Sequence, residues 1–197
     1  MDSTLVIAFL GAAITGFFTP GPNNLMLMAS GAKFGFSRTV PHGLGVSIGF
    51  AVMAGLVGLG LGQVFAAVPW LKTVLDYVAA AYLLWLAWTL LGLKVGNAAS
   101  AEKPLSFLQA AGFQWINPKA WAMAVSLGAL VIVPGPGEWA GLALLVVGCL
   151  VLGPLSSTLW MAFGERLQVL IQRVGGERYV GIALALLVVM SVVLFLI

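Results

Sequence analysis

The chain has 197 residues, of which 61% are hydrophobic and only 8% are charged. A soluble domain carries roughly 25% charged residues, so this composition excludes a water-soluble surface and indicates an integral membrane protein. The formal net charge of +3 comes from basic residues between apolar runs, a distribution typical of membrane orientation and not of nucleic-acid binding.

Six apolar segments follow one another, each close to the ~20 residues that span a bilayer as a helix. Such continuous runs lack the alternation of a β-barrel, and a helix satisfies its own backbone hydrogen bonds in lipid. The sequence therefore predicts an all-α integral membrane protein, a single transmembrane domain over residues 1–197 in contact with membrane lipid. The predicted helices are 4–28, 40–62, 70–92, 106–132, 139–161 and 179–197.

The first segment contains two prolines, a glycine and two asparagines in a row, which cannot continue an α-helix without losing hydrogen bonds. We expect a broken helix whose freed backbone groups and amides bind a small-molecule substrate. A packed proline kink capped by the asparagines is the alternative. The candidate binding residues here are Pro20, Gly21, Pro22, Asn23 and Asn24.

The next two segments contain two titratable groups of interest. Asp76 lies one turn after Lys72, so it forms either an interfacial ion pair or the proton-coupling group of a carrier. His42 is the only histidine, and one imidazole does not make a metal site.

Cys149, in the fifth segment, is the only cysteine, which excludes an intramolecular disulfide. We expect no catalytic residues, metal or cofactor.

The fourth segment is interrupted in a similar way by Gln114, Asn117, Pro118 and Lys119, which we also predict to bind substrate. For Gln114 the alternative is a hydrogen bond between helices. A lysine at the centre of a span costs about 2.5–3.5 kcal/mol to insert. Lys119 therefore either binds a substrate carboxylate or extends to the lipid headgroups.

The two interruptions align with each other. Residues 16–24 and 112–120 match at a glycine, a phenylalanine and a proline, at an offset of 96 residues. Because each half then holds three helices, an odd number, the second half must be inverted. The predicted architecture is a 3+3 inverted repeat of halves 1–95 and 96–197, with the first and fourth helices broken and both breaks flanking a central cavity.

The distribution of Lys and Arg predicts the orientation. The first, third and fifth connections carry seven of them, and the other side carries only Lys72, so both termini are expected to face the periplasm. The seven are Lys33, Arg38, Lys94, Lys103, Arg166, Arg173 and Arg178.

Four strings together resemble the LysE/RhtB amino-acid exporters over essentially the whole chain. They are Thr19 to Asn24, Lys33 to Arg38 with Gly45 and Gly49 beyond it, Ala81 to Leu86, and Gly112-Phe113 with Asn117-Pro118-Lys119. The resemblance implies a small carrier of the bacterial inner membrane that exports an amino acid or a close derivative from the cytoplasm, driven by the proton gradient. It names no single substrate, and a homo-oligomer is left open.

Two other classes of protein are alternatives to a carrier. An enzyme needs a catalytic cluster, and five of the six acids lie at loops or helix ends, so the chain is not expected to be one. A passive channel or scaffold is the stronger alternative. It does not require matched helix breaks, and uphill export separates it from a carrier.

Overall fold

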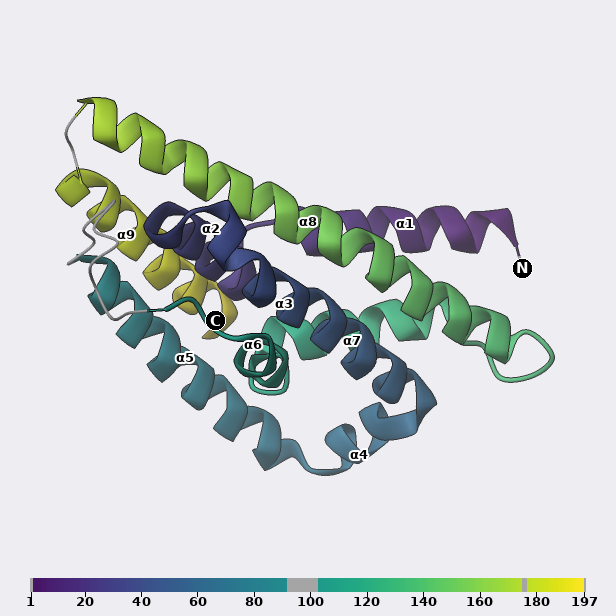
Figure 1. Ribbon diagram of the computed structural model, residues 1–197. Helices are drawn as coiled ribbons and strands as arrows, with labels where there is room; N and C mark the ends of the chain where they lie inside the picture. The colour runs from purple at the N-terminus through teal and green to yellow at the C-terminus, as the bar shows by residue number, and fades with distance from the viewer. Residues whose placement is uncertain (1, 92–102, 175–176, 197) are drawn as a thin grey trace.

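The structure is a computed structural model that describes residues 2–91, 103–174 and 177–196. Regular secondary structure in these residues is helical throughout, which confirms the all-α prediction (Figure 1). The helices are α1 (Ser3–Phe18), α2 (Pro22–Phe34), α3 (Phe36–Leu56), a π-helical turn (Val57–Leu61), α4 (Gly62–Ala67), α5 (Pro69–Leu91), α6 (Phe107–Phe113), α7 (Pro118–Val131), α8 (Glu138–Val174) and α9 (Glu177–Leu196).

Both predicted helix breaks are present. The axes of α1 and α2 are bent by 47° at the first break, and α6 and α7 are separated by the second. Pro22 and Pro118 each open the helix that follows, where a missing N–H costs nothing. These are the two prolines that align at an offset of 96 residues.

The molecule has the apolar exterior of a membrane protein. Trp88 is 75% exposed and Leu108 is 78% exposed, as expected for side chains that contact lipid. In the described residues, Phe36–Leu61 and Glu138–Ile171 are each long and apolar enough to cross a bilayer, and the bent α1–α2 pair meets the same test as one span.

The arrangement of the broken helices supports the inverted repeat, although the six spans and the repeat itself stay predictions. Figure 1 shows α1 and α7 extending toward the end of the molecule where the N-terminus lies, whereas α2 lies toward the opposite end. α8 packs along α3, and α5 packs along α9, so helices that correspond in the predicted repeat contact each other, and α8 packs along α2 as well.

The fifth predicted helix is much longer than expected. We predicted 139–161 from the apolar run, but α8 continues to Val174. Its last turns bury Ile171 among side chains of α2, α5 and α9, with Leu167 packed against them, while Arg166 and Arg173 are exposed on α8 and not in a loop. Tertiary packing of one face therefore extends the helix past the end of the apolar run.

Candidate functional site

The first break is held by side chains that bind its free carbonyl groups. The Asn24 side chain donates from Nδ2 to the Phe17 and Thr19 carbonyl oxygens, at 2.8 Å each. Ser156 Oγ of α8 donates to the same Phe17 oxygen at 2.6 Å. Backbone groups that lose helical partners in lipid must be satisfied in this way, so the break is a stable feature of the fold.

The second break begins where α6 ends and turns over residues 114–117. Asn117 is the N-cap of α7: its Oδ1 accepts a hydrogen bond from the Lys119 backbone N–H at 3.1 Å. Asn117 is buried, with 1% of its surface exposed. This cap aims the first turn of α7, and with it Lys119, toward α1.

The two breaks touch each other. Asn23 Nδ2 donates to Gln114 Oε1 at 2.8 Å, and Gln114 Nε2 donates back to Asn23 Oδ1 at 3.2 Å and to the Ala110 oxygen at 3.0 Å. Residues 91 positions apart in the chain therefore pair as neighbours. The contact agrees with our expectation that the breaks flank one central region.

Lys119 joins the breaks a second time. Its Nζ donates to the carbonyl oxygen and to Oγ1 of Thr19, at 3.0 Å each. These oxygens follow the C-terminal end of α1, where the helix dipole favours a cation. Gly21 makes room for the lysine, because a Cβ there would lie 2.8 Å from Lys119 Cδ. The ammonium thus reaches across to α1, with Lys119 half-buried.

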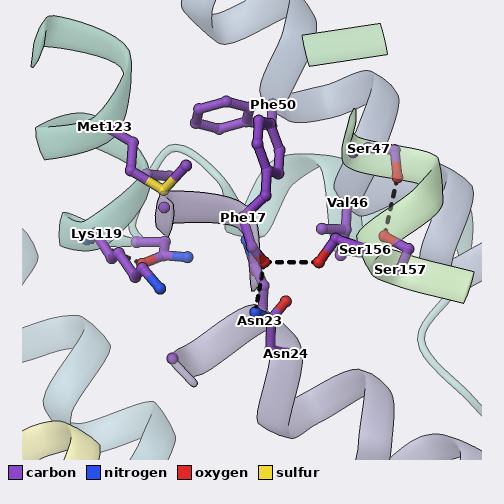
Figure 2. Close-up of a pocket in the computed structure, with 15 residues that line it drawn as sticks. Phe17, Asn23, Asn24, Val46, Ser47, Phe50, Lys119, Met123, Ser156 and Ser157 are labelled. Carbon is purple, nitrogen blue, oxygen red and sulfur yellow. Dashed lines mark hydrogen bonds between the residues drawn. The ribbon is translucent and has the colours of Figure 1, made fainter. Parts of the chain in front are cut away.

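A cavity of about 40 Å³ lies between the breaks (Figure 2). Polar groups from four helices surround it, and aromatic and thioether side chains close it. Among the lining residues that the structure describes, Lys119 is the one charged side chain, and none is a carboxylate. The wall is formed by Gly16, Phe17, Gly21, Asn23, Asn24, Val46, Ser47, Phe50, Asn117, Lys119, Ala120, Met123, Gly153, Ser156 and Ser157.

Five of the predicted binding residues line this cavity: Gly21, Asn23, Asn24, Asn117 and Lys119. The other four, Pro20, Pro22, Gln114 and Pro118, are not part of its wall. Pro22 and Pro118 start helices, and Gln114 makes the interhelical hydrogen bonds that were its alternative interpretation. The side chains of Lys72 and Asp76 lie outside the described residues, so their ion pair and the proton-coupling role both stay predictions.

Three serines in the wall were missed from the sequence. Ser47 Oγ of α3 lies 2.9 Å from Ser157 Oγ of α8, and Ser156 is the residue that binds the first break. For the two serines of α8, the signal that was overlooked is a pair of adjacent hydroxyls, Ser156 and Ser157, two residues after Pro154 in a largely apolar run. Polar groups at membrane depth usually face the interior of the bundle.

Comparisons with known proteins show the family of the chain. A family model described as LysE type translocator matches residues 14–197. The chain belongs to the LysE type translocator family.

Among its relatives are proteins named cysteine/O-acetylserine efflux protein. Those of Escherichia coli K12 and Shigella sonnei are 28% identical over 190 residues, which is 96% of this chain and 96% of each relative. The protein of Escherichia coli O139:H28 is 27% identical over the same share of both chains. No solved structure matches the chain.

Proposed function

We propose that this protein exports a small zwitterionic amino acid of the cysteine or O-acetylserine class across the bacterial inner membrane, driven by the proton gradient. One observation carries the proposal: a single cation and several amides and hydroxyls line a cavity where two helix breaks meet. The family membership and the names of the relatives support the same class of substrate.

The cavity chemistry complements a zwitterion. The Lys119 ammonium would exchange its Thr19 contacts for the substrate carboxylate, a charge-assisted pair. The side-chain oxygens of Asn117 and Ser156 are acceptors close to the same space and would receive the substrate ammonium. Phe17 and Phe50 pack edge to face at 5.3 Å and limit the room for the substrate side chain, which favours small amino acids.

Transport would use the breaks as hinges. Broken helices place unwound backbone at the substrate and can bend at a few residues, so each break would open the cavity to one side in turn. We expect a cysteine at Asn23 or Asn117 to change its accessibility between the two sides when substrate is supplied. Equal access from one side only, in every condition, would rule out alternating exposure.

The direct test is export from proteoliposomes that hold purified protein and are loaded with labelled O-acetyl-L-serine or cysteine. We expect movement against a concentration gradient under an imposed pH difference, abolished by a protonophore. Transport that only ever runs downhill would establish a passive channel instead.

Variants of Lys119 then test the site. Lys119→Met should lower export about tenfold to a hundredfold at normal membrane levels, because hydrogen bonds to charged groups contribute about 1.5–3 kcal/mol. Lys119→Arg should keep part of the activity, and Arg173→Met, at an exposed position of α8, is the matched control. Wild-type export by Lys119→Met would reject the carboxylate role and leave Asn23, Asn24 and Asn117.

A further inference from the structure

A second and larger cavity, of about 320 Å³, lies beside the connection between α2 and α3. We call it the inner cavity, because that connection is part of the basic side of the protein. Helices α2, α3 and α5 and residues 103–105 form its wall. The wall consists of Met26, Ala29, Ser30, Lys33, Phe34, His42, Tyr82, Trp85, Leu86, Thr89, Lys103, Pro104 and Leu105.

The inner cavity has basic side chains in its wall. Lys33 and Lys103 both line it, and the lining residues that the structure describes include no aspartate or glutamate. Arg38 adds a third cation nearby, with its guanidinium 5.5 Å from the Phe34 ring that also lines the cavity. Because the walls are otherwise largely apolar, this charge concentrates anionic groups at the cavity.

His42 is the second observation that points to a ligand. It is 2% exposed and contributes to the cavity wall, yet neither ring nitrogen has a hydrogen-bond partner in the described part of the chain. A buried polar group without a partner is rare and costs free energy. A neutral imidazole offers one donor and one acceptor, which is the pair of contacts that a zwitterion uses.

The inner cavity is in line with the central one. On α3, His42 lies one turn before Val46, which lines the central cavity, and on α2 Ser30 follows Asn23 and Asn24 by two turns or less. Val46 also belongs to an apolar cluster with Leu27, Ala110 and Met161. The two cavities are therefore lined by residues about one helical turn apart on α3.

We propose that the inner cavity is a second binding site, in which the amino acid is bound before it passes to the central cavity. Lys33 and Lys103 bind the carboxylate, and His42 forms hydrogen bonds with the polar groups of the same molecule. This inference rests on the proposed function, because it takes the exported amino acid as its ligand.

Cysteine protection tests the proposal directly. Cys149→Ser removes the native thiol, and Thr89→Cys then places one in the wall of the inner cavity. In phosphatidylcholine proteoliposomes, a water-soluble maleimide should label this cysteine, and O-acetyl-L-serine should slow the labelling. Ser37→Cys, an exposed position outside the cavity wall, should be labelled on the same side without protection.

Substitutions in the wall of the inner cavity test whether the proposed residues bind the protecting amino acid. His42→Phe and Lys103→Met should each raise the half-protecting concentration at least tenfold, and His42→Gln, which keeps a donor and an acceptor, should raise it less. Lys119→Met should keep the protection at the inner cavity while its export is lowered as stated above. If His42→Phe does not reach the membrane, His42→Gln and Lys103→Met carry the test.

Three results would overturn the inference: no labelling of Thr89→Cys, labelling without protection while the wild type exports, or unchanged protection in both His42→Phe and Lys103→Met. Protection of the Thr89→Cys thiol that appears only after phosphatidylglycerol is added to the proteoliposomes would identify a lipid headgroup as the ligand. That result would also overturn the inference. Protection without any export would instead contradict the proposed function and leave the binding site in place.

Discussion

The Lys119 ammonium forms its hydrogen bonds with neutral oxygens, so a substrate carboxylate can replace its present partners. Both of the hydrogen bonds that its Nζ makes within the described part of the chain go to Thr19, and no described residue of the cavity wall is acidic. A bond to a neutral oxygen is weaker than a pair with a carboxylate. The ammonium is therefore available to exchange Thr19 for an incoming carboxylate, whereas a buried ion pair would have to be broken first.

Gly21 sets the space for this lysine. In Gly21→Ala the new Cβ would lie 2.8 Å from Lys119 Cδ and 2.9 Å from Nζ, so the flexible side chain must move away from Thr19. The backbone at Gly21 is extended and accepts alanine without strain. We expect near-normal membrane levels but export reduced about tenfold, since a charged hydrogen bond is worth ~1.5–3 kcal/mol.

The control for Gly21 is Gly112→Ala, where an added Cβ meets nothing within 4 Å. Initial rates of O-acetyl-L-serine export, normalised to protein in the membrane, would be compared for the two variants. Full activity in Gly21→Ala would show that the position of the ammonium is not critical.

The Asn23–Gln114 pair should behave as one unit in stability measurements. Gln114 is completely buried, so Asn23→Ala leaves its Oε1 without the donor it has now, at a cost of ~1–3 kcal/mol. Gln114→Ala similarly leaves Asn23 without its partner. The double variant should lose less than the sum of the single losses, as measured by thermal unfolding in detergent. Strictly additive losses would mean that the two amides do not interact.

At the scale of the elements, α8 packs closely against α2 through glycines. A Cβ at Gly164 would meet the Met28 carbonyl oxygen, and one at Gly31 would meet that of Met161. Close approach of backbones is the usual role of small residues between membrane helices. Both atoms that an added Cβ would meet belong to the backbone, so a larger residue would push α2 and α8 apart. That movement would also disturb the first break, to which α8 is hydrogen-bonded through Ser156.

Gly31→Ala and Gly164→Ala should therefore destabilise the protein by about 1–3 kcal/mol each, the usual cost of overpacking. Gly11→Ala, within α1, is the control, because nothing lies within 4 Å of its Cβ position. Membrane levels and melting temperatures in detergent would show the difference. Equal behaviour of all three variants would contradict the close packing of α2 and α8.

At the scale of the whole molecule, the described segments that carry most of the basic residues lie at the end opposite the N-terminus. The α2–α3 connection and the ends of α5 and α8 lie toward one end in Figure 1, and the N-terminus lies toward the other. This separation is what the positive-inside rule requires if the basic end faces the cytoplasm.

We therefore predict that both termini face the periplasm. A fluorescent reporter that matures only in the cytoplasm should be silent when fused after Ile197, and alkaline phosphatase, which is active only in the periplasm, should be active there. The same reporters placed at Ser37, at the basic end, should give the reverse result and serve as the control. A bright cytoplasmic signal after Ile197 would show that this topology is wrong.

The sequence by itself determined the helical class, the positions of both breaks and most of the residues around them. Breaks and spans are local properties: Pro20, Pro22 and Pro118 interrupt hydrogen bonding wherever they lie, and apolar runs must be helical in lipid. Even the correspondence of Pro22 and Pro118 was visible as an offset of 96 residues.

Only the tertiary structure decided how these local features combine. Nothing local indicates that Asn23 pairs with Gln114, that Lys119 reaches Thr19, or that the hydroxyl groups of α8 hold the first break. Those contacts depend on the bend of each broken helix and on the packing of α8, which also extends that helix beyond its apolar run. The cavities exist for the same reason, because each is enclosed by residues far apart in the chain whose distances are set only when the helices pack.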